Sequence, residues 1–341
     1  MKQKKVTFAD IAAYTGFSKT TISRYFNNPD SLTLENQEKI AHALDVLGYQ
    51  ENKLAKVLAN GKSEFVGIII PNLYLHYYSE MLNQLLSTYE KYNYKFLVFI
   101  GNNKKEIEEK YIHELMAYKI EGLIVLSNTI SSEELASYKL PVVTIERECD
   151  HVCSVSTDNY LGGVQATSLL IRNKCDVILH INSIFPDTLP TYGRIRGFED
   201  ICNEHHVAHE LIQRDLGNTY QETLTQLKNI FNEIEKKYPS QKKGVFLAND
   251  TYASMFLNLI FQKYGKLPKD YQIVGFDDSP IASEAILPIT TVGQQIEKIA
   301  QTAMELLVLQ MNEMKKRKPA PLKEPVHKQI TPVLIRRDTT D

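Results

Sequence analysis

The sequence predicts an α/β protein with a small N-terminal all-α head and a larger body built on two doubly wound parallel sheets. Residues 1–62 hold short amphipathic helical patterns without a strand-like run. Residues 63–341 instead alternate short apolar runs with longer amphipathic stretches, which is typical of parallel sheets covered by helices. Because a body of this length exceeds what a single sheet usually buries, two lobes are expected.

Charge is distributed unevenly between these two parts. The whole chain has a formal net charge of -2, with 43% hydrophobic and 23% charged residues. Residues 1–62 contain nine Lys/Arg and six Asp/Glu, whereas the remainder contains 30 and 35. A basic head on a mildly acidic body favours a nucleic acid partner for the head.

The head begins with two short helices joined by a tight turn. Thr7 is placed to cap a helix over 8–14, and Gly16 permits the turn that follows. Ser18 can cap the second helix, in which Ile22 faces the first helix. Two helices joined in this way form a helix-turn-helix.

The open face of the second helix carries side chains that can read DNA. Lys19, Thr20 and Arg24 lie on that face. An Arg side chain can make two hydrogen bonds to a guanine edge, and Thr offers a hydroxyl or methyl contact. Ser23 and Asn27 complete the predicted DNA contacts, with Ser23 placed to meet a phosphate. The alternative is an ordinary three-helix bundle with a solvated polar face.

A third helix and a short link complete the head. Thr33 caps the predicted third helix over 35–47. The following segment, 53–59, is too short to hold a helix alone in water, so its folding requires DNA or a second subunit. The predicted domains are 1–50 for the helix-turn-helix, 51–62 for the hinge helix and linker, and 63–341 for effector binding and dimerisation.

Two stretches of the head carry a family resemblance. Residues 6–28 read VTFADIAAYTGFSKTTISRYFNN, and residues 47–63 read LGYQENKLAKVLANGKS. They resemble the head and hinge of the LacI/GalR family of bacterial transcription factors. The resemblance implies that Lys19, Thr20 and Arg24 read the major groove, and that Asn52 and Leu58 belong to a hinge whose leucine wedges into the minor groove. Glu51 stands where the family usually has Pro.

The body is predicted as alternating strands and helices. The strands cover 66–70, 96–100, 123–126, 142–145, 177–181, 245–248 and 273–276, and the helices 78–92, 106–118, 162–171, 197–205, 220–236, 253–264 and 296–314. The N-lobe is expected to comprise about 63–160 and 290–318, and the C-lobe about 161–289 and 319–341.

Polar side chains follow several of these strands, where ligands of open parallel sheets bind. The candidates are Asn72, Glu146, Arg147, Asn249 and Asp277 after strands, and Arg194 at the start of a helix. Carboxylates, amides and an Arg fork suit a polyhydroxylated ligand such as a sugar. Each residue alone also has a structural explanation, because Asp and Asn at strand ends commonly cap helices or turns.

The body also resembles a known domain. Its stretches GRIRGFED, FLANDTYA, IVGFDDSPIA, LPITTVGQQ and PVLIRRDTT are similar, in that order, to the LacI/GalR effector domain, a bilobed periplasmic-binding-protein-like fold. The resemblance implies effector contacts from Arg194, Asn249 and Asp277, and from Glu146 where some members have an acidic contact. Asn72, Tyr77 and Gln294 are further candidates, and simple helix packing is the alternative for Tyr77. RNKCDVILHINS and FPDTLPTY depart from the family pattern.

These observations predict a cytoplasmic, homodimeric regulator, most simply a repressor of a carbohydrate-utilisation operon. It would bind a pseudopalindromic double-stranded operator and a small sugar or sugar-phosphate effector, with no cofactor and no metal. Induction and corepression both fit the resemblance, as does control by a phosphorylated partner protein. The expected dimer lacks the leucine-heptad tail of a lactose-repressor tetramer.

Two other classes of protein fit less well. A solute-binding receptor would share the bilobed body, but the sequence shows no signal peptide and such a receptor has no use for the head. An enzyme is disfavoured because the chain lacks dinucleotide, phosphate-binding and nucleophile-elbow motifs. The four cysteines form no Cys-x-x-Cys pair and are expected to be reduced structural thiols.

Overall fold

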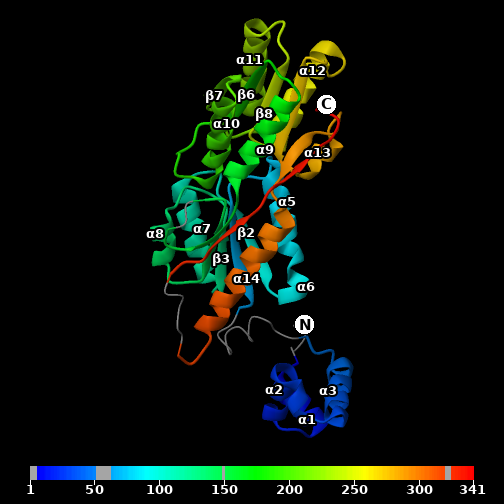
Figure 1. The fold of residues 1–341 in the computed structure, drawn as a ribbon. Helices are drawn as coiled ribbons and strands as arrows, with labels where there is room; N and C mark the ends of the chain where they lie inside the picture. The colour runs from blue at the N-terminus through cyan, green and yellow to red at the C-terminus, as the bar shows by residue number, and fades with distance from the viewer. Residues whose placement is uncertain (1–5, 51–62, 148–149, 319–323) are drawn as a thin grey trace. The chain divides into compact units, whose positions relative to one another are not determined.

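The computed structural model describes residues 6–50, 63–147, 150–318 and 324–341. Contacts divide the chain into a first unit, Met1–Lys62, and a second unit, Ser63–Asp341. The α/β class with a helical head and two largely parallel sheets is confirmed (Figure 1). Within the described ranges, none of the helices has both the length and the apolar character needed to cross a lipid bilayer.

The head consists of α1 (Phe8–Thr15), α2 (Lys19–Asn27), the 3-10 turn η1 (Pro29–Ser31) and α3 (Leu34–Val46). The predicted caps are confirmed. The Ser18 hydroxyl accepts from the Thr21 backbone N–H at 3.1 Å, and the Thr33 hydroxyl accepts from that of Asn36 at 3.4 Å. Fully buried Ile22 packs with the apolar faces of α1 and α3. This packing fixes which face of α2 remains open to solvent.

The N-lobe sheet has the order β11-β5-β4-β3-β1-β2, with parallel pairing throughout. Its strands are β1 (Phe65–Ile70), β2 (Lys95–Ile100), β3 (Gly122–Val125), β4 (Val142–Ile145), β5 (Cys153–Thr157) and β11 (His327–Ile330). One face is covered by α5 (His76–Ser87) and α14 (Ile296–Met314), with α6 (Tyr89–Tyr92) following α5. The other face is covered by α7 (Lys105–Ala117) and α8 (Ser132–Ser137).

The C-lobe sheet has the order β12-β10-β9-β8-β6-β7, and β10 pairs with β12 antiparallel. Its strands are β6 (Val177–Ser183), β7 (Ala208–Arg214), β8 (Lys243–Leu247), β9 (Tyr271–Asp277), β10 (Thr290–Gly293) and β12 (Val333–Ile335). One face packs on α9 (Asn159–Arg172) and α10 (Gly193–Glu204), the latter preceded by η2 (Pro190–Tyr192). The other packs on α11 (Tyr220–Lys237) and α12 (Asp250–Tyr264), and α13 (Pro280–Glu284) adjoins α12.

Two of the predicted lobe assignments are wrong. Residues 290–293 form β10 and pair with β9 in the C-lobe, not with the N-lobe. Residues 327–330 form β11 and pair with β5 in the N-lobe, not with the C-lobe. Both strands are short and largely polar, so their sheet is chosen by a distant hydrogen-bonding partner rather than by their own apolar pattern. The described chain therefore passes between the lobes after β5, β10 and β11.

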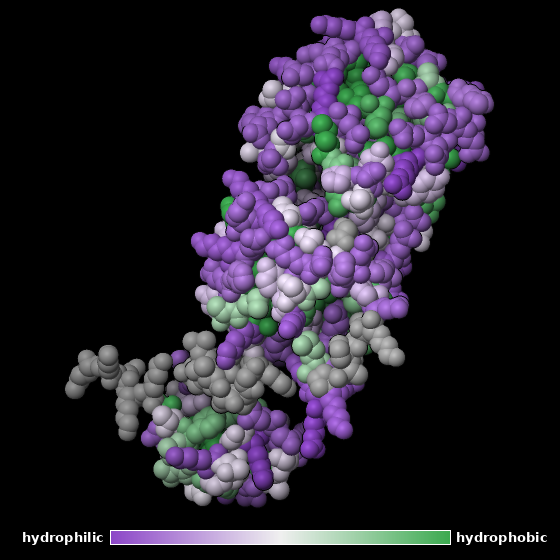
Figure 2. Space-filling model, turned by 90° about the vertical axis from the view of Figure 1, so that its left-hand side faces the viewer, coloured by the Kyte–Doolittle hydropathy of each residue, from purple (hydrophilic) through white to green (hydrophobic). Residues whose placement is uncertain are grey.

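The surface shown in Figure 2 is dominated by hydrophilic side chains, with apolar patches scattered over the body. Apolar residues are instead concentrated in the clusters on both faces of each sheet. Cys153, Cys175 and Cys202 are buried free thiols within these clusters or at their edges, and Cys149 lies outside the described residues. Such a surface is ordinary for a protein in water.

Helices α9 and α10 approach each other so closely that glycine is required at their contact. A Cβ added to Gly163 would lie 2.4 Å from the Arg194 carbonyl oxygen, and one added to Gly197 would lie 2.4 Å from the Tyr160 carbonyl oxygen. These obstacles are backbone atoms, which cannot rotate away as a side chain could. The two glycines therefore set the distance between the helices and the position of the first turn of α10.

We expect Gly197→Ala to destabilise the body by about 1–3 kcal/mol, because the added methyl group forces the two backbones apart. Urea unfolding of the full chain measures this change. Asn203→Ala, at an exposed position of the same helix, is the control and should stay within about 0.5 kcal/mol of the parent. Equal stability of Gly197→Ala and the control would contradict the close contact.

Candidate functional site

The open face of α2 presents a cluster of polar side chains. Lys19, Thr20 and Arg24 are exposed, whereas Ile22 beneath them is fully buried. Asn27 donates from its amide nitrogen to the Ser23 carbonyl oxygen at 3.0 Å and lies 3.2 Å from the Ser23 hydroxyl. The side chains of Lys19, Thr20 and Arg24 therefore extend into solvent from one helix face, whereas Asn27 is hydrogen-bonded to Ser23.

The predicted hinge contacts cannot be placed in the same way. Asn52 and Leu58 lie outside the described residues, as does Glu51.

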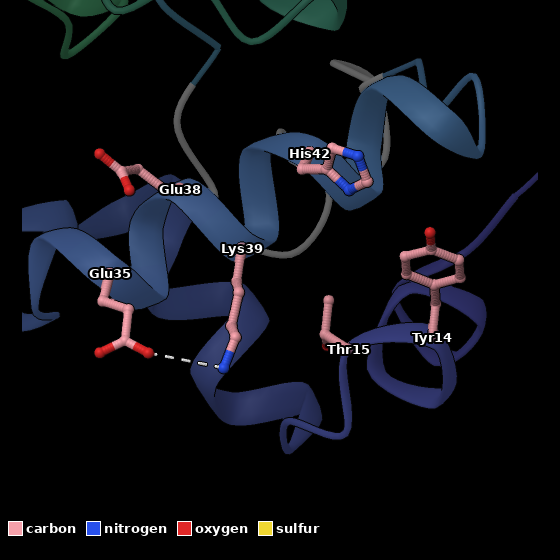
Figure 3. A pocket seen from close by; sticks show the side chains of 6 residues that line it. All are labelled: Tyr14, Thr15, Glu35, Glu38, Lys39 and His42. Atoms are coloured by element: carbon pink, nitrogen blue, oxygen red, sulfur yellow. Dashed lines mark ion pairs between the residues drawn. The ribbon is translucent and has the colours of Figure 1, made fainter.

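A separate hollow of about 370 Å³ lies on the head between α1 and α3 (Figure 3). It is lined by Tyr14, Thr15, Glu35, Glu38, Lys39 and His42. Lys39 lies 3.6 Å from the Glu35 carboxylate, and the lining mixes both signs of charge. No residue of α2 lines this hollow, so Lys39 is a cation of the head that lies outside the polar face described above.

In the body, the polar residues around the passages between lobes form a closed ring. Glu146 follows β4, adopts a positive φ of 55° and is buried. Its carboxylate accepts from the Thr157 backbone N–H and from the Asn159 side-chain amide, the latter at 2.8 Å. The Asn159 amide oxygen accepts from Arg194 Nε at 2.8 Å. This half of the ring joins the end of the N-lobe strands to α10 of the C-lobe.

The other half of the ring returns from Arg194 to Thr157. Arg194 lies 3.9 Å from the Asp277 carboxylate and covers the Phe276 ring, with 3.7 Å between the guanidinium carbon and the ring centroid. Gln294 donates to Asp277 at 2.5 Å and accepts from the Thr157 hydroxyl at 2.6 Å. Four predicted residues, Glu146, Arg194, Asp277 and Gln294, are thus brought together in a buried network that spans both lobes.

Two other predicted residues cap helices. Asn249 accepts from the Tyr252 backbone N–H at 2.8 Å as the N-cap of α12. Asn72 accepts from the Leu75 backbone N–H at 3.2 Å ahead of α5. These are the bonds that a strand-end Asn usually makes, so the structural explanation accounts for the amide oxygen of each.

Arg147 is buried but directed away from the ring. Its guanidinium donates to the carbonyl oxygens of Ser127 and Ile130, in the loop after β3. The side chain therefore holds that loop in place.

Two residues of the ring were not predicted, nor was the buried carboxylate of Asp250 that senses the charge of Asp277. Thr157 and Asn159 flank the passage from β5 to α9, and β5 itself was missed because CSVST has no apolar run. Asp250 accepts from the Ser279 backbone N–H at 2.9 Å and from the Thr291 hydroxyl at 2.6 Å. Its position directly after Asn249 at a strand end was the one signal available for it.

Burial shifts the acid–base properties of the carboxylates. It raises the pKa of Asp277 to about 7, although Arg194 and Gln294 favour the ionised form. Burial likewise raises the pKa of Glu146, again opposed by Arg194. For Asp250, burial and then the neighbouring Asp277 raise the pKa. One guanidinium thus faces a group of carboxylates that water does not solvate.

Tyr77, on α5, faces the same group. Its side chain is only 8% exposed, and its hydroxyl has no hydrogen-bond partner within the described part of the chain. Burial, followed by the charges of Glu146 and Asp277, raises the pKa of Tyr77 well above its ordinary value. A buried hydroxyl without a partner costs free energy, so this one is a strained feature of the packing around the ring. Among the described residues, no cluster of His, Cys, Asp or Glu is placed to hold a metal ion.

Comparison with known proteins gives two family matches, one in the head and one in the body. Residues 7–52 match the family described as bacterial regulatory proteins, lacI family. Residues 168–340 match the periplasmic binding protein-like domain.

Similar proteins span nearly the whole chain. The sucrose operon repressor of Streptococcus mutans is 26% identical over 303 residues, which cover 88% of this chain and 91% of that protein. The ribose operon repressor of Halalkalibacterium halodurans is 24% identical over 306 residues, covering 89% and 90%. The transcriptional regulator RegA of Clostridium saccharobutylicum is 28% identical over 311 residues, covering 89% and 92%.

Solved structures share the fold. The lac repressor dimer bound to operator and the anti-inducer ONPF has a TM-score of 0.80 at 22% identity, covering 99% of each chain. A regulator from Alkaliphilus metalliredigens in complex with D-xylulofuranose has a TM-score of 0.69 at 26% identity, covering 82% of this chain and 100% of that one.

The raised carboxylate pKa values predict how stability depends on pH. An acid whose pKa is higher in the folded state stabilises the fold when protonated. For Asp277 this stabilisation is complete below its ordinary pKa of 3.8 and is lost as the pH rises through about 7. Glu146 and Asp250 shift in the same direction, so the free energy of unfolding should fall from about pH 4 to about pH 8.

In Asp277→Asn the free energy of unfolding should decrease less between these pH values, by on the order of 2 kcal/mol, because the amide cannot ionise. Urea unfolding of the full chain at a series of pH values measures it. Asp278→Asn is the matched control, since Asp278 is partly exposed and paired with Arg337 at 2.6 Å. The control should keep the slope of the parent, and an unchanged slope in Asp277→Asn would show that Asp277 is not the titrating group.

Proposed function

The chain belongs to the LacI family of bacterial regulatory proteins, and we propose that it represses a carbohydrate-utilisation operon under the control of a small sugar or sugar-phosphate. The observation that carries this proposal is the buried ring formed by side chains of both lobes. A ligand that exchanges hydrogen bonds with the ring changes how the lobes are held. In a regulator, this change in the arrangement of the lobes must alter the DNA affinity of the head.

The head supplies the DNA contacts in this proposal. Lys19, Thr20 and Arg24 read bases in the major groove, while Ser23 and Asn27 contact the backbone at the edge of the same face. Asn52 and Leu58 of the hinge act in the minor groove. The exposure of the first three side chains on α2 supports the first part, and the resemblance in sequence supports the second.

A homodimer is the natural assembly for such a head. Two helix-turn-helix units bind two half-sites, so the symmetry of the protein matches a pseudopalindromic operator. The structure described as a lac repressor dimer on its operator supports this arrangement by similarity of fold. Residues 1–50, 51–62 and 63–341 then serve as head, hinge and effector domain. The protein acts on DNA in the cytoplasm and catalyses no reaction.

The effector binds among Tyr77, Glu146, Arg194, Asp277 and Gln294. Carboxylate and amide oxygens accept hydrogen bonds from vicinal hydroxyls, and the Tyr77 ring offers an apolar face. Asn72 and Asn249 support this site from the ends of neighbouring strands, and Arg147 supports it indirectly by holding the loop after β3. Relatives named for sucrose and ribose operons, and a similar structure holding D-xylulofuranose, favour a sugar. Control then operates by a coupling free energy between the effector site and the DNA site.

Arg24→Ala tests the reading of bases. Loss of a bidentate guanine contact should cost about 1–3 kcal/mol on operator DNA, with a smaller loss on random DNA. Fluorescence anisotropy with both DNAs, using the region upstream of the gene as a source of operator, measures the two affinities. Lys39→Ala, which removes a cation beside the hollow between α1 and α3, controls for charge alone. An equal loss on operator and random DNA would exclude base reading by Arg24.

Tyr77→Phe tests the effector site. The variant should not lower the free energy of unfolding, because the buried hydroxyl that it removes has no hydrogen-bond partner among the described residues. It should raise the effector concentration for half-maximal change in DNA affinity by about 3- to 10-fold, the effect of one hydrogen bond. Tyr111→Phe, on α7 against Phe99, is the matched control. An unchanged effector response in Tyr77→Phe would remove Tyr77 from the site.

A further inference from the structure

We propose that the site between the lobes takes only uncharged polyhydroxy ligands and rejects the same sugars when they carry a phosphate or carboxylate. This inference rests on the proposed function, because it concerns the effector of that same site. It narrows the ligand class from sugars and sugar phosphates to neutral sugars.

The buried charges of the site are predominantly negative. Glu146, Asp250 and Asp277 are 7%, 0% and 3% exposed, and Arg194 is 6% exposed. Within the described residues, Arg194 is the only cation that bonds to the ring. When all of these groups are ionised, the site carries an excess of negative charge that water does not screen. A second anion brought into such a site meets repulsion that is stronger than in water.

The guanidinium of Arg194 is already committed to the protein. Its Nε donates to Asn159 at 2.8 Å, and one terminal nitrogen donates to the Ala248 carbonyl oxygen at 2.6 Å. One face of its plane is covered by Phe276. Tight binding of a phosphate or carboxylate by Arg uses a free pair of parallel N–H donors. An anion held in a fork that uses Nε would have to break the bond to Asn159, which is part of the ring.

The second guanidinium near the ring is occupied in the same way. Both terminal nitrogens of Arg147 donate to main-chain carbonyl oxygens, those of Ser127 and Ile130. These bonds hold a buried loop, so turning Arg147 toward a ligand would leave two carbonyl groups without donors.

The helix N-termini beside the site are also filled by the chain's own side chains. Asp158 caps α9 by accepting from the Leu161 backbone N–H at 3.0 Å. Asn249 caps α12, and the carboxylate of Asp250 lies in the first turn of the same helix. A helix N-terminus binds phosphate through free backbone N–H groups and its positive end. Both ends here already hold an oxygen acceptor, and α12 holds an anion in its first turn.

The remaining groups suit hydroxyl donors. Carboxylates are acceptors only, so they bind the O–H groups of a neutral sugar and repel the acceptor oxygens of a phosphate. The buried Tyr77 hydroxyl, which has no partner among the described residues, can donate to or accept from a sugar hydroxyl. Burial keeps it uncharged. Charge balance, committed donors and the available acceptors all favour a neutral ligand.

The test compares matched sugars on the full chain by isothermal titration calorimetry at about pH 8, above the value of about 7 to which burial raises the pKa of Asp277. The pairs are ribose and ribose 5-phosphate, fructose and fructose 6-phosphate, and glucose and gluconate. For any pair that binds, the neutral member should bind about 100-fold or more tightly than the anion. An anion that binds as tightly as its neutral partner, or more tightly, would overturn the inference.

Two variants test whether the carboxylates cause the preference for neutral over anionic sugars. Glu146→Gln and Asp277→Asn each remove one charge and should narrow the preference for the neutral sugar by about 10-fold. Asp278→Asn, which alters the neighbouring carboxylate paired with Arg337, should leave the preference unchanged. If either Glu146→Gln or Asp277→Asn fails to fold, the other still measures the effect of removing one negative charge. A preference unchanged in every variant would overturn the electrostatic basis of the inference.

DNA binding separates failure of this inference from failure of the proposed function. If an anionic sugar binds and changes the affinity for operator DNA, the regulator stands and neutral selectivity is wrong. If the chain binds operator DNA but none of the sugars in either form, control by a small sugar fails, and the selectivity fails with it.

Discussion

The buried ring through Glu146, Asn159, Arg194, Asp277, Gln294 and Thr157, closed by hydrogen bonds and by the ion pair between Arg194 and Asp277, is the constraint on which the body depends. Its members come from both lobes and from the passages between them. Charged groups removed from water are tolerated only when each has partners, so displacing one member leaves another unsatisfied. The ring therefore favours one arrangement of the lobes, and a ligand that supplies substitute partners can favour another.

The surrounding structure keeps this ring in place. The close crossing of α9 and α10 at Gly163 and Gly197 fixes the turn that carries Arg194. Gln294 lies between β10 of the C-lobe and α14, which packs on the N-lobe. Residues at such passages move whenever the lobes move, which is why a bond between Gln294 and Asp277 can report on ligand binding. Hinges of this kind are formed by a few residues at the ends of elements.

The sequence predicted those parts whose signal is local. β1 and α14 have apolar patterns that few other folds could satisfy, and Ser18 and Thr33 cap helices through their nearest neighbours. It could not predict β10 or β11, because both short polar strands are held by distant partners. The residues of the candidate site also differ in how far the sequence predicted them. Residue types at strand ends indicated Asp277 and Glu146, but Asn249 makes a local cap and Arg147 holds a loop. Asn159 was missed because its position depends on β5.

We propose that the effector site and the DNA site share one coupling free energy. Calorimetry of the full chain would measure the affinity for operator DNA with and without a saturating sugar, and the affinity for the same sugar with and without operator DNA. The account predicts that both affinities change by the same factor, about 5- to 150-fold, because coupling between two binding sites is reciprocal. Tight binding of both ligands with neither affecting the other would contradict it.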